Sequence, residues 1–334
     1  MFAIARVLAR VLTAALLIGG APASAWAQGG DDAKDYPGRA VRMIVPFPPG
    51  GPADVIARIV AQNMSQAWSQ PVVVENRPGG NTAIGAELVA KSPADGYTLL
   101  VAMDVTMVTN PLITPKLPYD ALKDFTPVTL LMRDISLITV RSDGPLTVRD
   151  LIAQAKANPG RLAMGAGTIT SRLGAVAFAT AAGIDVTLVP YKGSAEITQG
   201  LLTGAVDFAI DGVPNALPLI EAGKFRALAK YSDRPLPVLA DVPSLSIAAG
   251  LPDLSESSTW IGLVAPAGTP QPVVDKLQRE VASVFADPGL AARLAKSGMF
   301  TQSSTPEQFD AFIRSETARW RALLAGGIAD KILN

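Results

Sequence analysis

The chain has no histidine and no cysteine among its 334 residues. It therefore cannot contain a Ser-His-Asp or Cys-His catalytic arrangement, a disulfide bond, or a zinc site of the usual cysteine and histidine kind. Carboxylate chemistry stays open, because Asp and Glu together number 29. We expect no metal ion and no cofactor. A packed core must supply the stability, and the length suggests two domains of ordinary size.

The charges point to no polyanionic partner. Lys and Arg together number 29, which equals the number of acidic residues. No segment is basic enough to follow a phosphate backbone, so we expect no nucleic-acid partner.

The N-terminus differs from the rest of the chain. Arg6 and Arg10 precede a short apolar run over Val11–Ile18, and small residues follow up to Ala25–Ala27. This pattern predicts that residues 1–27 are a cleaved signal peptide. A membrane anchor is the alternative, but the run is shorter than the ~20 apolar residues that span a bilayer. Export without cysteine suits a periplasm, where thiols are oxidised.

After the leader, strand-like apolar runs alternate with helical patterns, which predicts an α/β protein. In the first third we expect strands at Val41–Pro46, Pro71–Glu75 and Tyr97–Ala102, and helices at Asp54–Trp68 and Ala83–Lys91. This order predicts a parallel sheet with helices on both faces.

The middle of the chain repeats this plan. Strands are expected at Ile135–Val140, Val186–Val189, Val206–Ile210 and Arg226–Tyr231, and a capping box at Thr147–Asp150 begins a helix. The tail is predicted helical at Pro272–Phe285, Gly289–Ser297 and Pro306–Leu324.

Two such sheets predict two lobes joined by two crossings. We place the crossings at Asp124–Leu131 and Ser257–Ala265. The first lobe then comprises residues 36–126 plus 258–334, and the second comprises 127–257. Ligands of open α/β sheets bind beyond the carboxyl ends of the strands, so we expect a cleft between the lobes that closes by a hinge motion.

The loop between the first strand and helix has the features of an anion site. Glycines let backbone N–H groups approach a ligand, and a proline suits the first helical position, where the positive end of the helix dipole lies. A carboxylate satisfies both, although a merely stiff connection is the alternative. We expect Asp54 to hold loop N–H groups or an ordered water. The candidate residues are Phe47, Pro48, Gly50, Gly51, Pro52, Ala53 and Asp54.

Other loops occupy equivalent places. Asn81 and Thr82 follow the second strand, and a hydroxyl-rich loop in the second lobe opens a helix. Lys192 and Asp211 follow later strands and are expected to face the cleft, although each is more often a surface or capping residue. The candidates in the hydroxyl-rich loop are Gly167, Thr168, Thr170, Ser171 and Arg172.

Two nucleotide motifs fail in this sequence. Thr170 replaces the third glycine of a dinucleotide loop, and Phe225 follows Gly223-Lys224 where a P-loop requires Ser or Thr. Arg172 can grip a carboxylate with two hydrogen bonds, and a solvated surface charge is the alternative.

Six segments occur in an order that resembles a known family. They are VRMIVPFPPGGPADVIAR, VVVENRPGGN, LPYDALKDFTPV, VPYKGS, GLLTGAVDFAIDGVP and WIGLVAPAGTP. They are similar to the receptors of tripartite tricarboxylate transporters, the Bug family of periplasmic binding proteins. The similarity extends from Tyr36 to the final helix.

This resemblance implies a type II periplasmic-binding-protein fold that closes on an organic acid. It implies that the loops Phe47–Asp54 and Gly165–Arg172 clamp a carboxylate through backbone amides, hydroxyls and bridging waters. Family Asn and Thr positions match Asn81 and Thr106, and the family Asp that ends a strand matches Asp211.

The chain departs from the family at two places beside the expected cleft. Arg172 stands where histidine is usual, and Asp104 stands where small or hydroxyl residues are usual. The first change suggests the hypothesis that Arg172 favours a ligand with a second carboxylate.

Three functions follow as candidates. The first is a receptor, expected to be monomeric, that passes its organic acid to the membrane permease subunits of a tripartite tricarboxylate transporter. The second is a receptor that docks to a sensor protein. The third is an exported enzyme with Asp54, Asp104 and Asp211 as acid/base groups, which we set below the others because no partner orients them.

Overall fold

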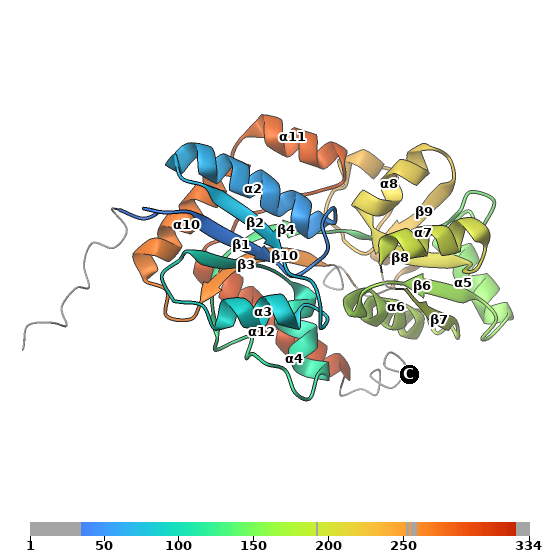
Figure 1. Ribbon diagram of the computed structural model, residues 1–334. Coiled ribbons are helices and arrows are strands. Elements are labelled where there is room, and N and C mark those ends of the chain that lie inside the picture. The colour runs from blue at the N-terminus through green and yellow to red at the C-terminus, as the bar shows by residue number, and fades with distance from the viewer. Residues whose placement is uncertain (1–34, 192, 252–253, 255–258, 325–334) are drawn as a thin grey trace, which may run out of the picture.

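The computed structural model describes residues 35–324, apart from residues 192, 252–253 and 255–258. The predicted signal peptide and Lys192 lie outside the described residues. Within them the chain forms two α/β lobes, which lie side by side in Figure 1.

The first lobe contains a five-stranded sheet with the order β2-β1-β3-β10-β4. Its strands are β1 (Val41–Val45), β2 (Val72–Asn76), β3 (Thr98–Met103), β4 (Phe125–Arg133) and β10 (Trp260–Pro266). β1 pairs in parallel with β2 and β3, whereas β10 runs antiparallel to β3 and β4. The three strands predicted to form a parallel sheet do so, and the segment predicted as a crossing at 257–265 adds the antiparallel strand β10.

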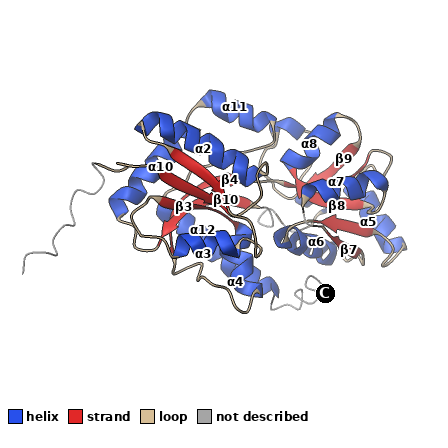
Figure 2. Cartoon of the chain, in the orientation of Figure 1, coloured by secondary structure: helices blue, strands red, loops and turns tan. Residues whose placement is uncertain are grey.

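Helices cover both faces of this sheet (Figure 2). Successive residues of β3 point to opposite faces, so Leu99 packs with α2 and α10 while Leu100 packs with α3 and α12. The first-lobe helices are α2 (Pro52–Trp68), α3 (Ala83–Ala90), α4 (Asn110–Ile113), α10 (Gln271–Phe285), α11 (Pro288–Lys296) and α12 (Pro306–Leu323), with a short π-helical segment η1 (Val105–Thr109).

The second lobe repeats the topology with the order β7-β6-β8-β5-β9. Its strands are β5 (Ser136–Arg141), β6 (Ala163–Ala166), β7 (Thr187–Pro190), β8 (Phe208–Gly212) and β9 (Phe225–Lys230). Its helices are α5 (Val148–Ala157), α6 (Ile169–Ala182), α7 (Ser194–Thr203), α8 (Val213–Glu221), the 3₁₀ turn η2 (Pro237–Leu239) and α9 (Leu245–Ala249). The predicted capping box is present, because Thr147 and Asp150 bond reciprocally at the start of α5.

The two crossings between the lobes lie side by side. β4 stays in the first sheet as far as Arg133, so the boundary expected after residue 126 falls inside this strand. The chain changes sheets at Asp134, whose N–H donates to the carbonyl oxygen of Thr259 on the returning crossing at 2.9 Å.

Helix α6 belongs to the second lobe but also packs on the first. Its Leu173 and Val176 are buried in the same apolar cluster as Met107 of η1 and Trp260 of β10. The Thr170 hydroxyl donates to the buried Asp104 carboxyl at the start of η1. Apolar packing and a polar contact therefore both connect the lobes.

One close contact in the first lobe gives a stability prediction. Gly262 lies in the middle of β10, and a Cβ added there would lie 2.0 Å from Cζ of the buried Phe309 ring. We expect Gly262→Ala to lower the free energy of unfolding by about 1–3 kcal/mol through overpacking. Denaturant unfolding measures this change.

The matched control uses the partner ring. In a Phe309→Leu background the added methyl group has more room, so Gly262→Ala should cost less there than in the natural chain. Equal costs in both backgrounds would contradict the packing explanation.

Candidate functional site

A cleft of about 580 Å³ lies between the lobes. Its first-lobe wall comes from the loop after β1 and from the ends of β3, β4 and β10. Its second-lobe wall comes from the loops after β6, β7 and β8. The first-lobe residues are Phe47, Pro48, Pro49, Gly51, Pro52, Ala53, Met103, Met132 and Ile261, and the second-lobe residues are Ser136, Gly167, Thr168, Ser171, Gly193, Ser194, Ala195, Glu196, Ile197, Asp211, Gly212 and Asn215, with Asp134 and Thr259 at the crossings.

Four helices begin at this cleft. Each of α2, α6, α7 and α8 follows a strand whose carboxyl end faces the opposite lobe, and residues at the N-cap or in the first turn of each helix line the cleft. α2, α7 and α8 have the glycine N-caps Gly51, Gly193 and Gly212, without a side-chain cap within the described chain. The first N–H groups of a helix have no partner inside it, and the dipole adds positive potential. The cleft therefore favours an anion.

Helix α6 is capped differently. The Ser171 N–H donates to Thr168 Oγ1 at 3.1 Å, and Ser171 Oγ donates to the Thr168 carbonyl oxygen at 2.8 Å. The two hydroxyl groups thus order the start of α6 at the edge of the cleft.

Asp54 organises the loop after β1. Its carboxylate accepts hydrogen bonds from the Gly50 N–H at 3.0 Å, from Asn76 Nδ2 at 2.9 Å and from both Arg58 Nε and Nη2, the latter at 2.8 Å. The Arg58 bond, with those from Gly50 and Asn76, lowers the pKa of Asp54 from 3.8 to about 2, although burial opposes the shift. Asp54 therefore holds a loop N–H, as expected, and Arg58 neutralises its charge.

Asp211 and its neighbours form a second polar group. Asp211 Oδ1 accepts from Ser194 Oγ at 2.8 Å, from the Gly212 N–H at 2.9 Å and from Asn215 Nδ2 at 3.2 Å. Burial raises the pKa of Asp211 to about 6 against these hydrogen bonds. The network ties the starts of α7 and α8 together at one wall of the cleft.

The cleft floor is largely apolar. Met103, Met132 and Ile261 come from adjacent strands of the first sheet, and Phe47 closes one side. A hydrocarbon chain fits this surface, while the helix starts offer hydrogen-bond donors.

Similarity to known proteins agrees with this geometry. The model of the tripartite tricarboxylate transporter family receptor, TctC, matches residues 56–326. This chain belongs to that receptor family. It is 35% identical to protein BugT of Bordetella pertussis, over 87% of this chain and 90% of the relative.

Solved structures also superpose on the chain. Rpa4515 of R. palustris, solved with adipate, is 34% identical, with a TM-score of 0.79 over 89% of this chain and 98% of that one. MatC of Rhodopseudomonas palustris, solved with malate, is 31% identical, with a TM-score of 0.75 over 86% and 99%. The predicted type II periplasmic-binding-protein fold is thereby confirmed.

The structure brings some of the predicted ligand-binding residues together on the cleft. On the cleft lie Phe47, Pro48, Gly51, Pro52, Ala53, Gly167, Thr168, Ser171 and Asp211. Gly50 and Asp54 do not line it but hold the loop that does.

A second part of the set forms a separate network. Asn81 Nδ2 donates to Asn110 Oδ1 at 2.7 Å, Thr106 Oγ1 donates to Thr82 Oγ1 at 3.0 Å, and Tyr119 donates to the Thr106 carbonyl oxygen at 2.6 Å. These polar groups use each other as partners. Asn81 and Thr82 have φ values of 49° and 77°, and the network holds this loop.

Three further predicted residues also lie off the cleft lining. Thr170 and Asp104 are buried in the contact between the lobes. The Arg172 guanidinium donates to the Tyr191 carbonyl oxygen at 3.1 Å, and burial lowers its pKa. Arg172 thus supports the loop before α7, so its expected grip on a ligand has no direct geometric support.

Sequence reasoning missed several lining residues. Asp134, Met132 and Thr259 come from the crossings and the strands beside them, and Asn215 comes from the first turn of α8. For Asn215 the sequence does contain a signal, because the segment DGVPN has the pattern of a strand end followed by a helix start. The crossing residues carry no comparable local motif.

No cluster of acidic residues in the described part of the chain has the arrangement of a metal site. None of the described helices is long and apolar enough to cross a membrane.

The Asp54 network gives a pH prediction. At pH 7 we expect Asp54→Asn to lower the free energy of unfolding by about 1–3 kcal/mol, as for other hydrogen bonds to buried charged groups. Because the folded-state pKa lies below the ordinary 3.8, this stabilisation is complete above that value and is lost as the pH falls toward about 2. Urea unfolding at a series of pH values measures the difference.

Asp310 provides a matched control. It pairs with Arg314 at the same i,i+4 spacing and at 2.7 Å, but both side chains are exposed. Asp310→Asn should change stability much less than Asp54→Asn. A loss at Asp54 that stayed constant down to pH 3 would contradict the role of its charge.

Proposed function

We propose that this protein is a periplasmic receptor that captures a small organic acid between its lobes and delivers it to the permease subunits of a tripartite tricarboxylate transporter. The convergence of four helix starts on one cleft carries this proposal. Backbone N–H groups and aligned dipoles provide donors and positive potential for a carboxylate without a charged side chain.

The shape and polarity of the cleft support an organic acid over an inorganic anion. A volume of about 580 Å³ falls within the usual ~300–1,000 Å³ of small-molecule pockets. Met103, Met132 and Ile261 offer apolar contacts for a carbon chain opposite the helix starts. The adipate and malate bound by the two similar proteins are molecules of this kind.

The arrangement of the carboxyl groups favours binding over catalysis. Asp54 is bonded to Arg58, Asp104 to Thr170, and Asp211 to Ser194 and Asn215. Ser194 donates its O–H to Asp211, but the chain has no histidine and no Lys occurs among the described lining residues, so the bases that usually activate a serine are missing there.

A charge placed at a helix start tests the binding mode. Ala195 is exposed and lies in the first turn of α7 on the cleft. We expect Ala195→Asp to preserve the fold but to weaken binding of adipate or malate by at least about tenfold, because like charges are brought together at the cleft. Calorimetry measures the affinity, and a thermal-shift screen of organic acids identifies the best probe.

Gln271→Glu is the control, because it adds one negative charge to the first turn of α10, outside the cleft. It should bind like the natural protein. Equal weakening by both substitutions would indicate a general charge effect and would remove the support for helix-start binding.

Delivery is tested separately from capture. Vesicles that contain the membrane subunits of a cognate tripartite tricarboxylate transporter should accumulate labelled ligand only when the purified receptor is supplied. Binding without any stimulation of uptake, together with capture of a sensor protein by the ligand-loaded receptor, would favour the sensory role.

A further inference from the structure

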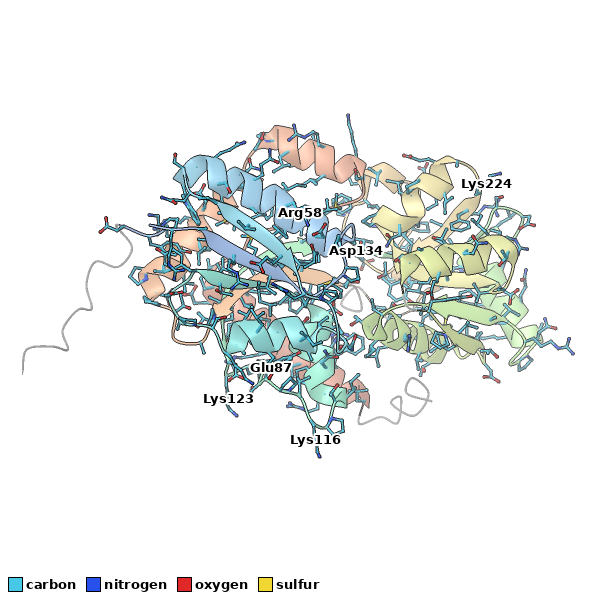
Figure 3. All side chains as sticks on the ribbon, viewed as in Figure 1. Arg58, Glu87, Lys116, Lys123, Asp134 and Lys224 are labelled. Atoms are coloured by element: carbon cyan, nitrogen blue, oxygen red, sulfur yellow. The ribbon has the colours of Figure 1, made fainter. Side chains whose placement is uncertain are left out.

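Asp134 lies in the cleft at the point where the chain passes between the lobes. It directly follows β4, and its backbone N–H is held by Thr259 of the other crossing. Its Oδ1 accepts the Ile135 N–H at 2.7 Å. Figure 3 shows Asp134 between the two lobes.

The Asp134 side chain is held against the second lobe. A Cβ added to Gly212 at the start of α8 would lie 2.0 Å from Asp134 Oδ2, so the carboxyl group occupies the space that this glycine leaves. Asp134 and Gly212 both line the cleft. The carboxyl group is therefore fixed beside one of the helix starts proposed to bind the ligand.

The charged groups around Asp134 are acidic. Asp211 on β8 and Asp104 at the start of η1 both act on it electrostatically, and Glu196 on α7 lines the same cleft. No Lys or Arg occurs among the described lining residues. Within the described lining, an ionised Asp134 would therefore face a bound carboxylate with no cation beside it.

Protonation removes this conflict. Burial, together with the charges of Asp211 and Asp104, raises the pKa of Asp134 to about 8, although the N–H groups of Ile135 and Val213 oppose the shift. At pH 7 its carboxyl group is then mostly neutral and has an O–H donor. A hydrogen bond from such a group to a carboxylate is charge-assisted and stronger than a neutral one.

We propose that Asp134 binds the ligand directly as a neutral carboxylic acid, donating its O–H to a carboxylate oxygen, so that capture of the anion at alkaline pH is accompanied by uptake of one proton. The inference rests on the proposed function, because it requires a carboxylate ligand. The proton comes from solution and stays on Asp134 in the complex.

The sign of the pH dependence follows from this scheme. A bound carboxylate favours the protonated form of Asp134 and raises its pKa further. As far as the titration of Asp134 is concerned, the affinity for the carboxylate ligand should be constant near and below pH 7. Above about pH 8 it should fall, approaching tenfold for each pH unit, since simple carboxylic acids are already fully ionised there.

Calorimetry with adipate, malate or succinate tests the proposal. Titrations at about pH 8.5, in buffers of different ionisation enthalpy, count the protons exchanged on binding. The natural protein should take up a substantial fraction of one proton. Asp134→Asn keeps a donor but cannot titrate, so it should take up none and should bind with an affinity that is constant from about pH 7 to about pH 9.

Two further variants separate Asp134 from its surroundings. Asp134→Leu has a similar volume without a donor and should bind at least about tenfold more weakly even at pH 7. Asp104→Asn tests the other acid near neutrality, because burial raises the pKa of Asp104 to about 7 in the contact between the lobes. Proton uptake at pH 8.5 should persist in Asp104→Asn. Thermal unfolding of each variant checks that the fold is intact.

Several results would overturn the inference. These are unchanged proton uptake in Asp134→Asn, unchanged affinity in Asp134→Leu, or loss of uptake in Asp104→Asn alone. Aspartate that bound more tightly than succinate, with proton release at pH 8.5, would show that Asp134 pairs as an anion with an ammonium group. If no organic acid bound saturably at pH 7, the proposed function itself would fail, and the inference with it.

Discussion

The N–H groups at helix starts, which have no acceptor within their own helix, are the constraint on which the cleft depends. In each lobe, parallel strands are followed by helices that begin at the same edge of the sheet, so the first turns of these helices gather there. Such N–H groups need acceptors, and a helix start buried without them is costly. Because both lobes turn this edge toward one cleft, an anionic ligand can satisfy starts from both lobes at once.

The side chains around the cleft keep these donors available. The Asp54 carboxylate holds the loop after β1 by accepting the Gly50 N–H. Arg58 neutralises its charge, and Asp54 is not among the residues that line the cleft. The glycine N-caps of α2 and α7 have no capping oxygen of their own, whereas the Val213 N–H at the start of α8 donates to the Ile135 carbonyl oxygen at 3.1 Å. The second-lobe acid Asp211 is bonded to Ser194, Gly212 and Asn215, which fixes the relative positions of α7 and α8.

Local patterns predicted most elements of each lobe and the parallel pairing of the first three strands, but not the antiparallel direction of β10 and β5. The run at Val41–Val45 and the amphipathic pattern of α2 were visible because burial repeats with the period of a strand or a helix. β10 and β5 are apolar like their neighbours, and nothing in hydrophobicity distinguishes an antiparallel central strand from a parallel one. For the same reason β4 gave no sign that it continues in the first sheet as far as Arg133.

The site was predictable where a motif is local and unpredictable where it depends on how the lobes meet. The loop at Phe47–Ala53 has its own signature of proline and glycine, and it lines the cleft. Asn81 and Thr106 have the same residue types as a polar binding site, yet within the first lobe Asn81 donates to Asn110 and Thr106 donates to Thr82. Asp134 shows the opposite case. A single acid between Arg133 and Ile135 has no pattern, and its meaning comes from Gly212, Asp211 and Thr259, which the fold brings to it from far along the chain.

The absence of histidine has a further consequence in this site. Titration near neutral pH normally belongs to histidine, which this chain lacks. Burial instead raises the pKa values of Asp104, Asp134 and Asp211 to about 7, 8 and 6. Two of these acids line the cleft and the third lies in the contact between the lobes. Desolvation of carboxyl groups therefore gives this receptor titratable groups near neutral pH that its composition otherwise lacks.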